Sequence, residues 1–335
     1  MPSLKGKKVL YIGQRFFGYE KEIKLMLERE GASVDYYNER PSSTFLTKAY
    51  IRLKLQSLIY LKIQNYYNDI LETIKDIEFD YVFIVKIETI DEKILKSLKK
   101  SQPNAKFILY MWDSLKNYKQ NNKILDLFDR AYTFDSNDVK SYSNLTFLPL
   151  FYIAKYQNSE EYKIKNDLCF IGSGHSDRYL VVKKLFKIAS SLNLSQYTFF
   201  FLQSKIIFIF RKIFDKRMRD AKMEEFSFTS LSQEEIIQTM LESRAIVDIE
   251  HPGQIGLTMR TIEMIGLKKK LITTNRSIKE YDFYNENNIY IINRNNLKLD
   301  KAFFDLPYQE LDDAIYKKYS LQNWIQTIFL EGMNN

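Results

Sequence analysis

Short apolar runs alternate with segments of helical periodicity along most of the chain. The apolar runs are rich in β-branched and aromatic residues, as buried strands usually are. They lie at 8–12, 34–37, 81–85, 107–111, 130–134 and 146–150 in the first half, and at 168–171, 197–202, 245–249, 271–274 and 289–292 in the second. Helical segments separate most of these strands, and this order is typical of parallel α/β domains.

The helical segments carry apolar residues every three or four positions and end at recognisable signals. Gly31 follows one helix and Gly266 closes another, as C-terminal glycines do. Ser232 and Glu235 form a capping-box pattern ahead of a further helix. Including the two helices that end at these glycines, helices are expected at 19–30, 91–100, 178–192, 258–266, 276–283 and 311–330.

The stretch from Ser243 to Asn275 combines a strand, a loop, a helix and a second strand. The loop runs from His251 to Gly256 and contains a proline and two glycines, and Thr258 opens the helix. In parallel sheets, ligands bind in the crevice beyond the carboxyl ends of the strands. Because the loop lies at such an end, we expect it to contact a ligand.

One face of the helix after this loop carries Gly256, Arg260 and Glu263, since positions four and seven residues apart overlie each other. Free N–H groups at a helix start bind a diphosphate together with a guanidinium, and a carboxylate farther along accepts hydrogen bonds from ribose hydroxyls. The three residues are therefore candidate nucleotide ligands. The alternative is a core helix on which Arg260 and Glu263 form a surface ion pair.

A second loop of small residues follows the strand at 168–171. Ser173, Gly174 and His175 lead to Arg178 at the start of the next helix. Such a loop offers N–H groups to phosphate, and Arg178 adds a cation. His175 is either a contact to the diphosphate or sugar, or a solvent-exposed loop residue.

Glu88 and Asp113 each follow the carboxyl end of a predicted strand in the first half of the chain. A carboxylate in this place can take the proton of an acceptor hydroxyl, so both are candidate catalytic bases. Asp113 alternatively caps the helix that follows it. The glycines at 13 and 18 lack the spacing of a dinucleotide-binding loop.

The length of 335 residues suits two domains, and 45% hydrophobic with 27% charged residues is the composition of a globular protein. Cys169 is the only cysteine, which excludes a disulfide scaffold and a cysteine-rich metal site. His175 and His251 are the only histidines, so a histidine-built zinc site is excluded as well. We therefore expect no metal.

The formal net charge of +8 favours polyanionic surroundings, and basic residues mix with apolar ones at 41–70 and, more densely, at 205–222. Helices of this kind can lie on an anionic membrane. The alternative is that they pack on the sheet or hold their charges in solvent. No nucleic-acid motif is recognised. No apolar run reaches about 18–20 residues and no targeting region precedes the first strand, so we expect a cytoplasmic protein.

Two segments resemble glycosyltransferases of the GT-B type. Their nucleotide-sugar donor site is similar to the segment HPGQIGLTMRTIEMIGLKKKLITTN. The start of bacterial polysaccharide and lipopolysaccharide biosynthesis transferases, including relatives of the spore-maturation type, resembles the segment KKVLYIGQRFFGYEKEIKLMLEREGASVDYYNERP. The resemblance implies two Rossmann-like parallel-sheet domains that face a central cleft, an acceptor domain at 1–155 and a donor domain at 165–315. A helix at 316–335 would cross back onto the first domain.

The resemblance also implies roles for the candidate residues. Arg260 and the loop of Gly174 would bind the diphosphate, Glu263 the ribose, and His251 and Thr258 would lie near the sugar or phosphate. The predicted function is metal-independent transfer of a sugar from a nucleotide-diphosphate sugar to a surface polysaccharide or lipid-linked glycan, by a hexosyltransferase without a cofactor.

Further partners follow from the same hypothesis. We expect peripheral contact with an anionic membrane at its inner face, and no nucleic acid. A hypothesis from another class is a non-catalytic nucleotide- or sugar-binding protein that regulates or scaffolds a polysaccharide assembly. A nucleic-acid binder is the third, and it predicts salt-sensitive affinity for DNA or RNA.

Overall fold

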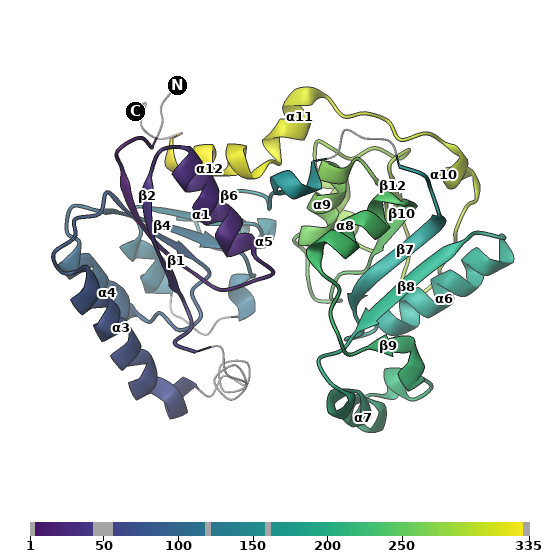
Figure 1. Ribbon diagram of the computed structural model, residues 1–335, viewed down its shortest axis with the longest axis horizontal. Coiled ribbons are helices and arrows are strands. Elements are labelled where there is room, and N and C mark those ends of the chain that lie inside the picture. Colours follow the sequence, from purple (N-terminus) through teal and green to yellow (C-terminus); the bar gives the residue numbers. More distant parts are fainter. Residues whose placement is uncertain (1–3, 43–55, 118–121, 158–161, 331–335) are drawn as a thin grey trace. The chain divides into compact units, whose positions relative to one another are not determined.

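The computed structural model describes residues 4–42, 56–117, 122–157 and 162–330, and it divides the chain into two compact units (Figure 1). Unit 1 comprises Met1–Leu150 and Leu321–Asn335, and unit 2 comprises Phe151–Ser320. Each unit is built on a six-stranded sheet whose neighbouring strands pair in parallel. The predicted α/β class with two Rossmann-like parallel sheets is confirmed.

The sheet of unit 1 has the strand order β2-β1-β3-β4-β5-β6. The order reverses between β1 and β3, so the loops after these two strands lie at the edge where ligands usually bind. All five residues of β3 are buried, as expected of a strand covered on both faces. The strands are β1 (Lys8–Gly13), β2 (Ser33–Asn38), β3 (Tyr81–Val85), β4 (Lys106–Met111), β5 (Arg130–Thr133) and β6 (Thr146–Phe147).

Alternate residues of these strands face different helices. Val82 and Ile84 join the core formed with α3 (Tyr60–Ile74) and α4 (Glu92–Ser101). On the other face, the ring of Tyr110 packs edge to face on Trp324 of α12 (Leu321–Phe329), with centroids 4.7 Å apart. A helix from the end of the sequence thus completes the core of unit 1. The other helical elements are α1 (Tyr19–Arg29), η1 (Gln56–Ile59), η2 (Leu115–Asn117), η3 (Asn122–Leu127) and α5 (Ser136–Ser141).

The sheet of unit 2 has the order β12-β11-β10-β7-β8-β9. Numbered from its own first strand, this is the 3-2-1-4-5-6 order of dinucleotide-binding sheets, with the reversal between β7 and β10. The strands are β7 (Asn166–Ser173), β8 (Gln196–Phe201), β9 (Phe226–Ser227), β10 (Ser243–Asp248), β11 (Lys270–Thr273) and β12 (Ile289–Ile291).

Helices cover the sheet of unit 2 as well. Phe170 of β7 and Val247 of β10 share a core with Leu185 of α6 (Arg178–Ser191). The remaining helical elements are η4 (Ala154–Tyr156), α7 (Lys205–Phe214), η5 (Lys216–Met218), η6 (Met223–Glu225), α8 (Gln233–Leu241), α9 (Met259–Leu267), η7 (Arg276–Glu280), α10 (Ala302–Asp305) and α11 (Asp313–Lys318). The predicted capping box of Ser232 and Glu235 is present at the start of α8.

The prediction that Gly266 closes its helix is wrong, because Gly266 lies inside α9. The helix ends one residue later, and Lys268 after it has a left-handed conformation with φ 53°. A Cβ on Gly266 would lie 2.8 Å from both Cγ of Tyr152 and the carbonyl oxygen of Tyr156. Glycine is therefore required here for the close packing of α9, and not for a turn.

Two other predicted helices are wrong in part. The segment 311–330 forms two helices, α11 and α12, that are interrupted at Tyr319. The carbonyl of Tyr319 accepts a hydrogen bond at 2.8 Å from the backbone N–H of Tyr152, which lies outside the segment. The segment 276–283 forms only the short helix η7, which the Asn275 side chain caps by accepting from Ser277 N–H.

The basic segment predicted at 41–70 lies partly outside the described residues, which resume at 56. In the described part, α3 buries Ile63, Tyr67, Ile70 and Ile74, which agrees with a helix that packs on the sheet. Among the described residues, no helix is long and apolar enough to cross a membrane.

Candidate functional site

Loops at the strand-order reversal of unit 2 bring together most of the residues predicted to bind a donor. Ser173 ends β7, Gly174 and His175 follow it, and His251 and Thr258 lie after β10. β7 and β10 are neighbours in the sheet. The carboxyl ends of adjacent parallel strands at such a reversal flank the usual ligand crevice.

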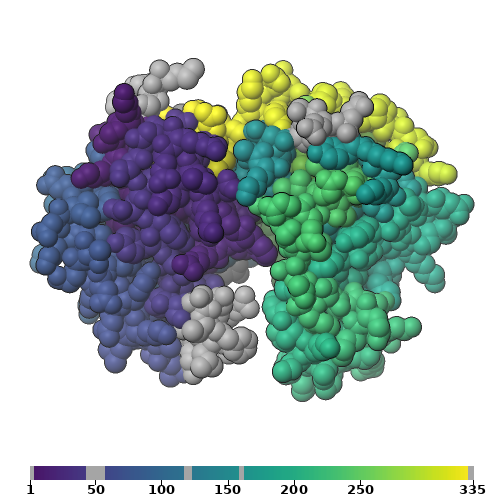
Figure 2. Space-filling view, viewed as in Figure 1, coloured from purple at the N-terminus to yellow at the C-terminus, as the bar shows by residue number. Residues whose placement is uncertain are grey.

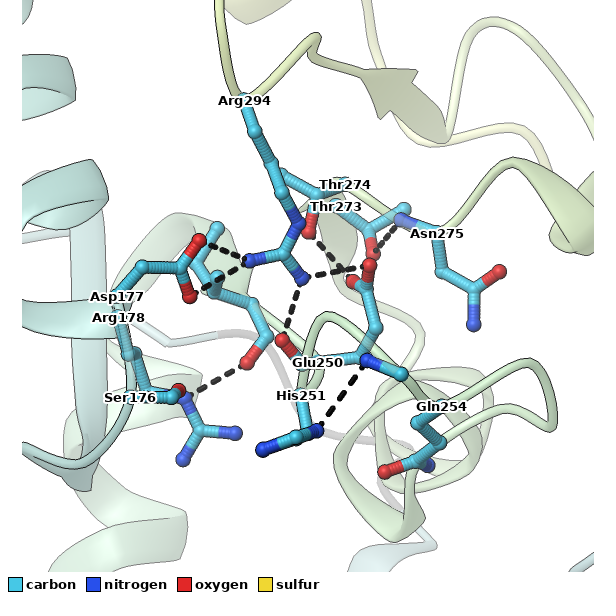
Figure 3. Close-up of polar contacts among 12 residues, drawn as sticks. Ser176, Asp177, Arg178, Glu250, His251, Gln254, Thr273, Thr274, Asn275 and Arg294 are labelled. Carbon is cyan, nitrogen blue, oxygen red and sulfur yellow. Dashed lines mark hydrogen bonds and ion pairs between the residues drawn. The ribbon is translucent and has the colours of Figure 1, made fainter.

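An arginine from a third loop holds two of these loops together (Figure 3). Arg294, which follows β12, donates to both carboxylate oxygens of Asp177 at 2.9 Å. It also forms an ion pair with Glu250 at 2.7 Å and donates to the carbonyl oxygen of Glu250. The second carboxylate oxygen of Glu250 accepts from the hydroxyl of Thr274. Glu250 is buried, and this cluster satisfies its charge.

Asp177 is the residue before α6, where a carboxylate usually caps the helix. Its side chain makes no capping hydrogen bond in this structure and is bound to Arg294 instead. The N–H group of Arg178 donates to the carbonyl oxygen of His175 at 3.3 Å, but the N–H groups that follow it have no side-chain cap from Asp177. A helix start of this kind favours an anion.

Arg178, the first residue of α6, bridges the loops after β7 and β10. Its Nε donates to the carbonyl oxygen of Ile249 at 2.7 Å, and one terminal nitrogen lies 3.4 Å from Nε2 of His175. In Figure 3 its terminal nitrogens point away from Arg294. Arg211 of α7 donates to the carbonyl oxygen of Gly174 at 3.1 Å. Both guanidinium groups therefore add positive charge to this loop while bound to carbonyl oxygens.

The pKa of His175 is affected by its burial and by this positive charge. Its pKa is lowered from 6.5 to about 4, first by burial and then by the neighbouring Arg178, Arg211 and His251. The rings of His175 and His251 have centroids 6.5 Å apart. His175 is half-buried, so it is not the solvent-exposed loop residue of the alternative interpretation. A neutral imidazole at neutral pH can donate or accept one hydrogen bond without adding charge.

The loop after β10 is held in place by polar contacts. The side chain of Asn275 donates to the carbonyl oxygen of Ile255 at 3.0 Å, and Gln254 donates to that of Gly256 at 2.9 Å. Thr258 caps α9 by accepting from Thr261 N–H, and its hydroxyl donates to Asp248. Both Gly256 and Thr258 therefore have structural contacts in this loop.

Arg260 and Glu263 lie farther along α9 and contact each other. Their ion pair is 2.8 Å long, and another contact of Arg260 is the sulfur of Met240 in α8, at 2.9 Å. Glu263 is buried, and burial together with this carboxylate raises the pKa of Tyr156. The two residues form the ion pair of the alternative interpretation, with Glu263 buried and the side chain of Arg260 20% exposed.

In unit 1, Glu88 and Asp113 lie at the carboxyl ends of β3 and β4 and share Lys86. The ammonium group of Lys86 is 2.6 Å from Asp113 and 3.8 Å from Glu88. Glu88 also forms an ion pair with Arg40 at 2.5 Å and accepts from Gln14 at 2.8 Å. Asp113 is the more accessible carboxylate, with 43% of its side chain exposed against 15% for Glu88.

A third carboxylate supports this loop from below the surface. Glu39 is fully buried and accepts the backbone N–H groups of Glu88, Thr89 and Ile90. Burial raises the pKa of Glu39, and the neighbouring Glu88 adds to this, although the hydrogen bonds oppose it. Glu39 therefore fixes the backbone that carries Glu88.

Sequence reasoning missed several charged members of both clusters. Arg294 and Lys86 each follow a strand that the sequence predicts, so the rule that identified Glu88 would have found them. Glu250 stands directly before His251 and could be found in the same way. Arg40 also follows a predicted strand, at 34–37, and could be found by the same rule. Arg211 carries no such signal, because only the folded chain brings its helix to the loop of Gly174. Among the described residues, no group of three or more His, Cys, Asp or Glu side chains could hold a metal ion.

Sequence comparison finds no matching protein-family profile and no matching curated protein. Structure comparison does find matches. HepE from Anabaena in complex with UDP-glucose aligns with a TM-score of 0.62 at 9% identity, over 96% of this chain and 98% of HepE. The lipopolysaccharide outer core galactosyltransferase WaaB aligns with a TM-score of 0.51 at 14% identity, over 97% of this chain and 99% of WaaB.

A trehalose-6-phosphate synthase, studied for glycosyl transfer with retention, aligns with a TM-score of 0.64 at 11% identity, over 95% of this chain and 97% of its own. The chain has the GT-B fold. Units 1 and 2 are its two Rossmann-like domains. At these identities the likeness is one of backbone architecture.

Proposed function

We propose that the protein is a glycosyltransferase that moves a hexosyl group from a nucleotide-diphosphate sugar to a surface polysaccharide or lipid-linked glycan. The GT-B fold supports the proposal, since the structures that share it include HepE in complexes with UDP-glucose and with UDP, and the galactosyltransferase WaaB. The protein would act in the cytoplasm, in peripheral contact with the inner face of the membrane.

The observation that carries the proposal is the start of α6 at the strand-order reversal of unit 2. Its first N–H groups lack a side-chain cap, and Arg178 and Arg211 add positive charge. A diphosphate leaving group gains negative charge as the glycosidic bond breaks, and fixed N–H groups and guanidinium groups stabilise that charge. In this proposal they do so without a metal ion or another cofactor.

The remaining donor contacts are assigned by place. Ser173, Gly174 and His175 would contact the diphosphate, and His251 and Thr258 the sugar or phosphate. Gly256 lets the loop approach the ligand. On α9, Glu263 would accept from the ribose hydroxyls, with Arg260 holding its carboxylate in position.

Unit 1 would bind the acceptor, with Asp113 or Glu88 as the base that takes the proton of its hydroxyl. Asp113 is favoured because it is the more accessible of the two. Aromatic rings lie near it in sequence and space: Phe16 packs on Trp112 with centroids 5.3 Å apart, and Phe17 is 79% exposed. Exposed rings of this kind suit the apolar face of a sugar.

The deciding experiment measures thermal unfolding of the purified protein with UDP, GDP, CMP, dTDP and their sugars, each with magnesium and with EDTA. A ligand at one hundred times its Kd stabilises by about 2.7 kcal/mol, which raises Tm measurably. We expect one nucleotide class to raise Tm equally in magnesium and in EDTA. No shift with any of these ligands would contradict the proposal.

A non-catalytic nucleotide-sugar-binding protein is the second candidate, because both candidate bases are occupied by ion pairs with Lys86. It predicts the same rise in Tm without turnover. Release of the nucleotide from its sugar when a glycan acceptor is added separates the two, since only a transferase produces it.

A further inference from the structure

Helix α7 turns an apolar side toward solvent. Ile206, Ile209, Phe210, Ile213 and Phe214 are between 49% and 78% exposed. Their spacing of three, four, seven and eight residues places them in one stripe along the helix. Phe210 and Phe214 contact each other, with ring centroids 4.5 Å apart. A monomeric protein rarely leaves such a stripe in water unless another surface covers it.

The other side of α7 is already occupied within unit 2. Phe208 is buried in the core, the Arg211 side chain reaches the carbonyl of Gly174, and Lys212 donates to the carbonyl of Ala221. Ser204 caps the helix by accepting from Ile207 N–H. The helix is therefore fixed with its apolar stripe outward. The alternative, a helix that turns only its charges toward solvent, does not fit this orientation. In Figure 2 this segment forms part of the surface of unit 2.

Basic side chains lie beside the apolar stripe and just after the end of α7. Lys205, Lys212, Lys216, Arg219 and Lys222 are all exposed within or just after α7. Beside the helix, a hollow of about 370 Å³ is lined by Phe208, Ile209, Ile213, Met223 and Glu224, and by the side chains of Lys212 and Lys222. The surface thus offers apolar contact and, beside it, positive charge.

We propose that α7 docks on an anionic lipid surface, with the stripe of Ile206, Ile209, Phe210, Ile213 and Phe214 in the acyl region and the basic side chains on the headgroup phosphates. Interfacial helices combine an apolar face with lysines and arginines in this way. A protein interface also has an apolar centre, but lysine is depleted there, whereas four of the five basic side chains beside this stripe are lysines. A nucleic-acid backbone binds through its phosphates and would leave the five apolar side chains exposed.

Docking through α7 would bring the donor loop to the lipid surface, because Arg211 joins the helix to Gly174. That step rests on the proposed function and suits a lipid-linked acceptor. Lipid binding itself does not rest on the proposed function, since it requires no nucleotide sugar. The two proposals therefore fail in different experiments.

The test is co-sedimentation of the full-length protein with vesicles of phosphatidylcholine, with and without phosphatidylglycerol. We expect binding that depends on phosphatidylglycerol and that the double variant Phe210→Ser/Phe214→Ser weakens by at least about tenfold. Both side chains are exposed, so the variant should unfold at the temperature of the wild type. The variant Lys216→Gln/Arg219→Gln should weaken the preference for phosphatidylglycerol.

The matched control is Leu58→Ser/Leu61→Ser, which removes two equally exposed apolar side chains from unit 1. It should bind vesicles as the wild type does. Absence of wild-type binding, or an equal loss in the control, would overturn the proposal. Analytical ultracentrifugation provides a further check. A concentration-dependent dimer that the Phe210→Ser/Phe214→Ser variant abolishes, together with no binding to vesicles, would also overturn the proposal. A second copy of the chain would then cover the stripe.

Discussion

The two sheets carry charged clusters at the same edge, but their cations have different partners. In unit 1 the cations lie on carboxylates: Arg40 on Glu88 at 2.5 Å, and Lys86 on Asp113 at 2.6 Å. A third carboxylate, Glu39, is buried beneath them. The acidic groups of this cluster therefore outnumber the basic ones.

In unit 2 a single cation, Arg294, holds the two carboxylates of Asp177 and Glu250. Arg178 and Arg211 donate to carbonyl oxygens. The nearby carboxylates of Asp248 and Glu250 offset part of the charge of Arg178. The comparison indicates that two copies of one sheet type can be tuned for opposite tasks, one for attracting an anion and the other for offering a carboxylate. The loops after the strands make this difference, since both sheets are six-stranded and parallel and differ in strand order.

The largest effect is expected from Asp113→Asn, which tests the acidic cluster. If Asp113 is the base, turnover should fall by about 10²–10⁴-fold while the Kd of the donor is unchanged, because the amide cannot accept a proton. Nucleotide release measures turnover, and calorimetry measures the Kd. Glu88→Gln, made in parallel, separates the two candidate bases.

The matched control for Asp113→Asn is Asp80→Asn, at the amino edge of the same sheet. Asp80 is also bound to a lysine, Lys7, at 2.7 Å. Wild-type turnover in Asp113→Asn, or an equal fall in Asp80→Asn, would contradict the catalytic role of the cluster.

The second effect concerns stability and compares Arg294 with Arg40. Arg294→Met leaves the buried Glu250 and Asp177 without their cation, so the free energy of unfolding should fall by about 3 kcal/mol. Arg40→Met should cost less, about 1 kcal/mol, because Glu88 keeps Lys86 and Gln14 as partners. Urea unfolding measures both.

A second substitution in the Arg294→Met background checks the cause. Glu250→Gln removes the uncompensated charge, so part of the lost stability should return. Equal losses in Arg294→Met and Arg40→Met, without recovery, would show that the two clusters do not differ as the contacts indicate.

The third effect tests the cationic loop itself. Arg178→Ala should weaken nucleotide-sugar binding by about 10- to 100-fold, the contribution of charge-assisted hydrogen bonds. Arg178→Lys should recover part of it by keeping the charge. Arg244→Ala is the control, since Arg244 lies at the amino end of β10, on the opposite edge of the sheet. Calorimetry that finds equal Kd values for Arg178→Ala and Arg244→Ala would place the anion elsewhere.

The fold and part of this comparison could be predicted from the sequence. Short β-branched runs locate strands directly, and the rule that ligands bind at carboxyl ends pointed to Glu88, Asp113 and the loop of Gly174. Which of the charged residues pair with one another could not be predicted, because most of these pairs join different loops. Arg40 and Arg294 have similar roles in separate sheets. They stand 254 residues apart, so no local sequence pattern relates them.

Periodicity also cannot say which side of a helix is covered. The region containing α3 and the one containing α7 both read as basic amphipathic segments. The structure buries the apolar side of α3, at Ile63 and Tyr67, and exposes that of α7, at Ile213 and Phe214. Only tertiary packing decides between these outcomes.

The smallest effect is a difference in pH dependence between the clusters. The pKa of His175 is about 4 in the folded protein and 6.5 when unfolded. Above 6.5 both forms are neutral, and stability does not change. As pH falls from 6.5 to 4, the unfolded chain takes the proton first, so stability falls, by about 1–2 kcal/mol once solvent screening is allowed for.

Glu39 in unit 1 should act in the opposite direction. Burial raises its pKa, so the folded protein takes its proton before the unfolded chain does, and this adds stability as pH falls toward 4.5. Tm measured against pH should therefore decline less steeply in His175→Gln and more steeply in Glu39→Gln than in the wild type. His251→Gln removes a smaller contribution to the lowered pKa of His175, so its decline should lie between those of His175→Gln and the wild type. If His175→Gln follows the wild type, neither burial nor the positive loop of unit 2 lowers the pKa of His175, and the contrast between the clusters fails there.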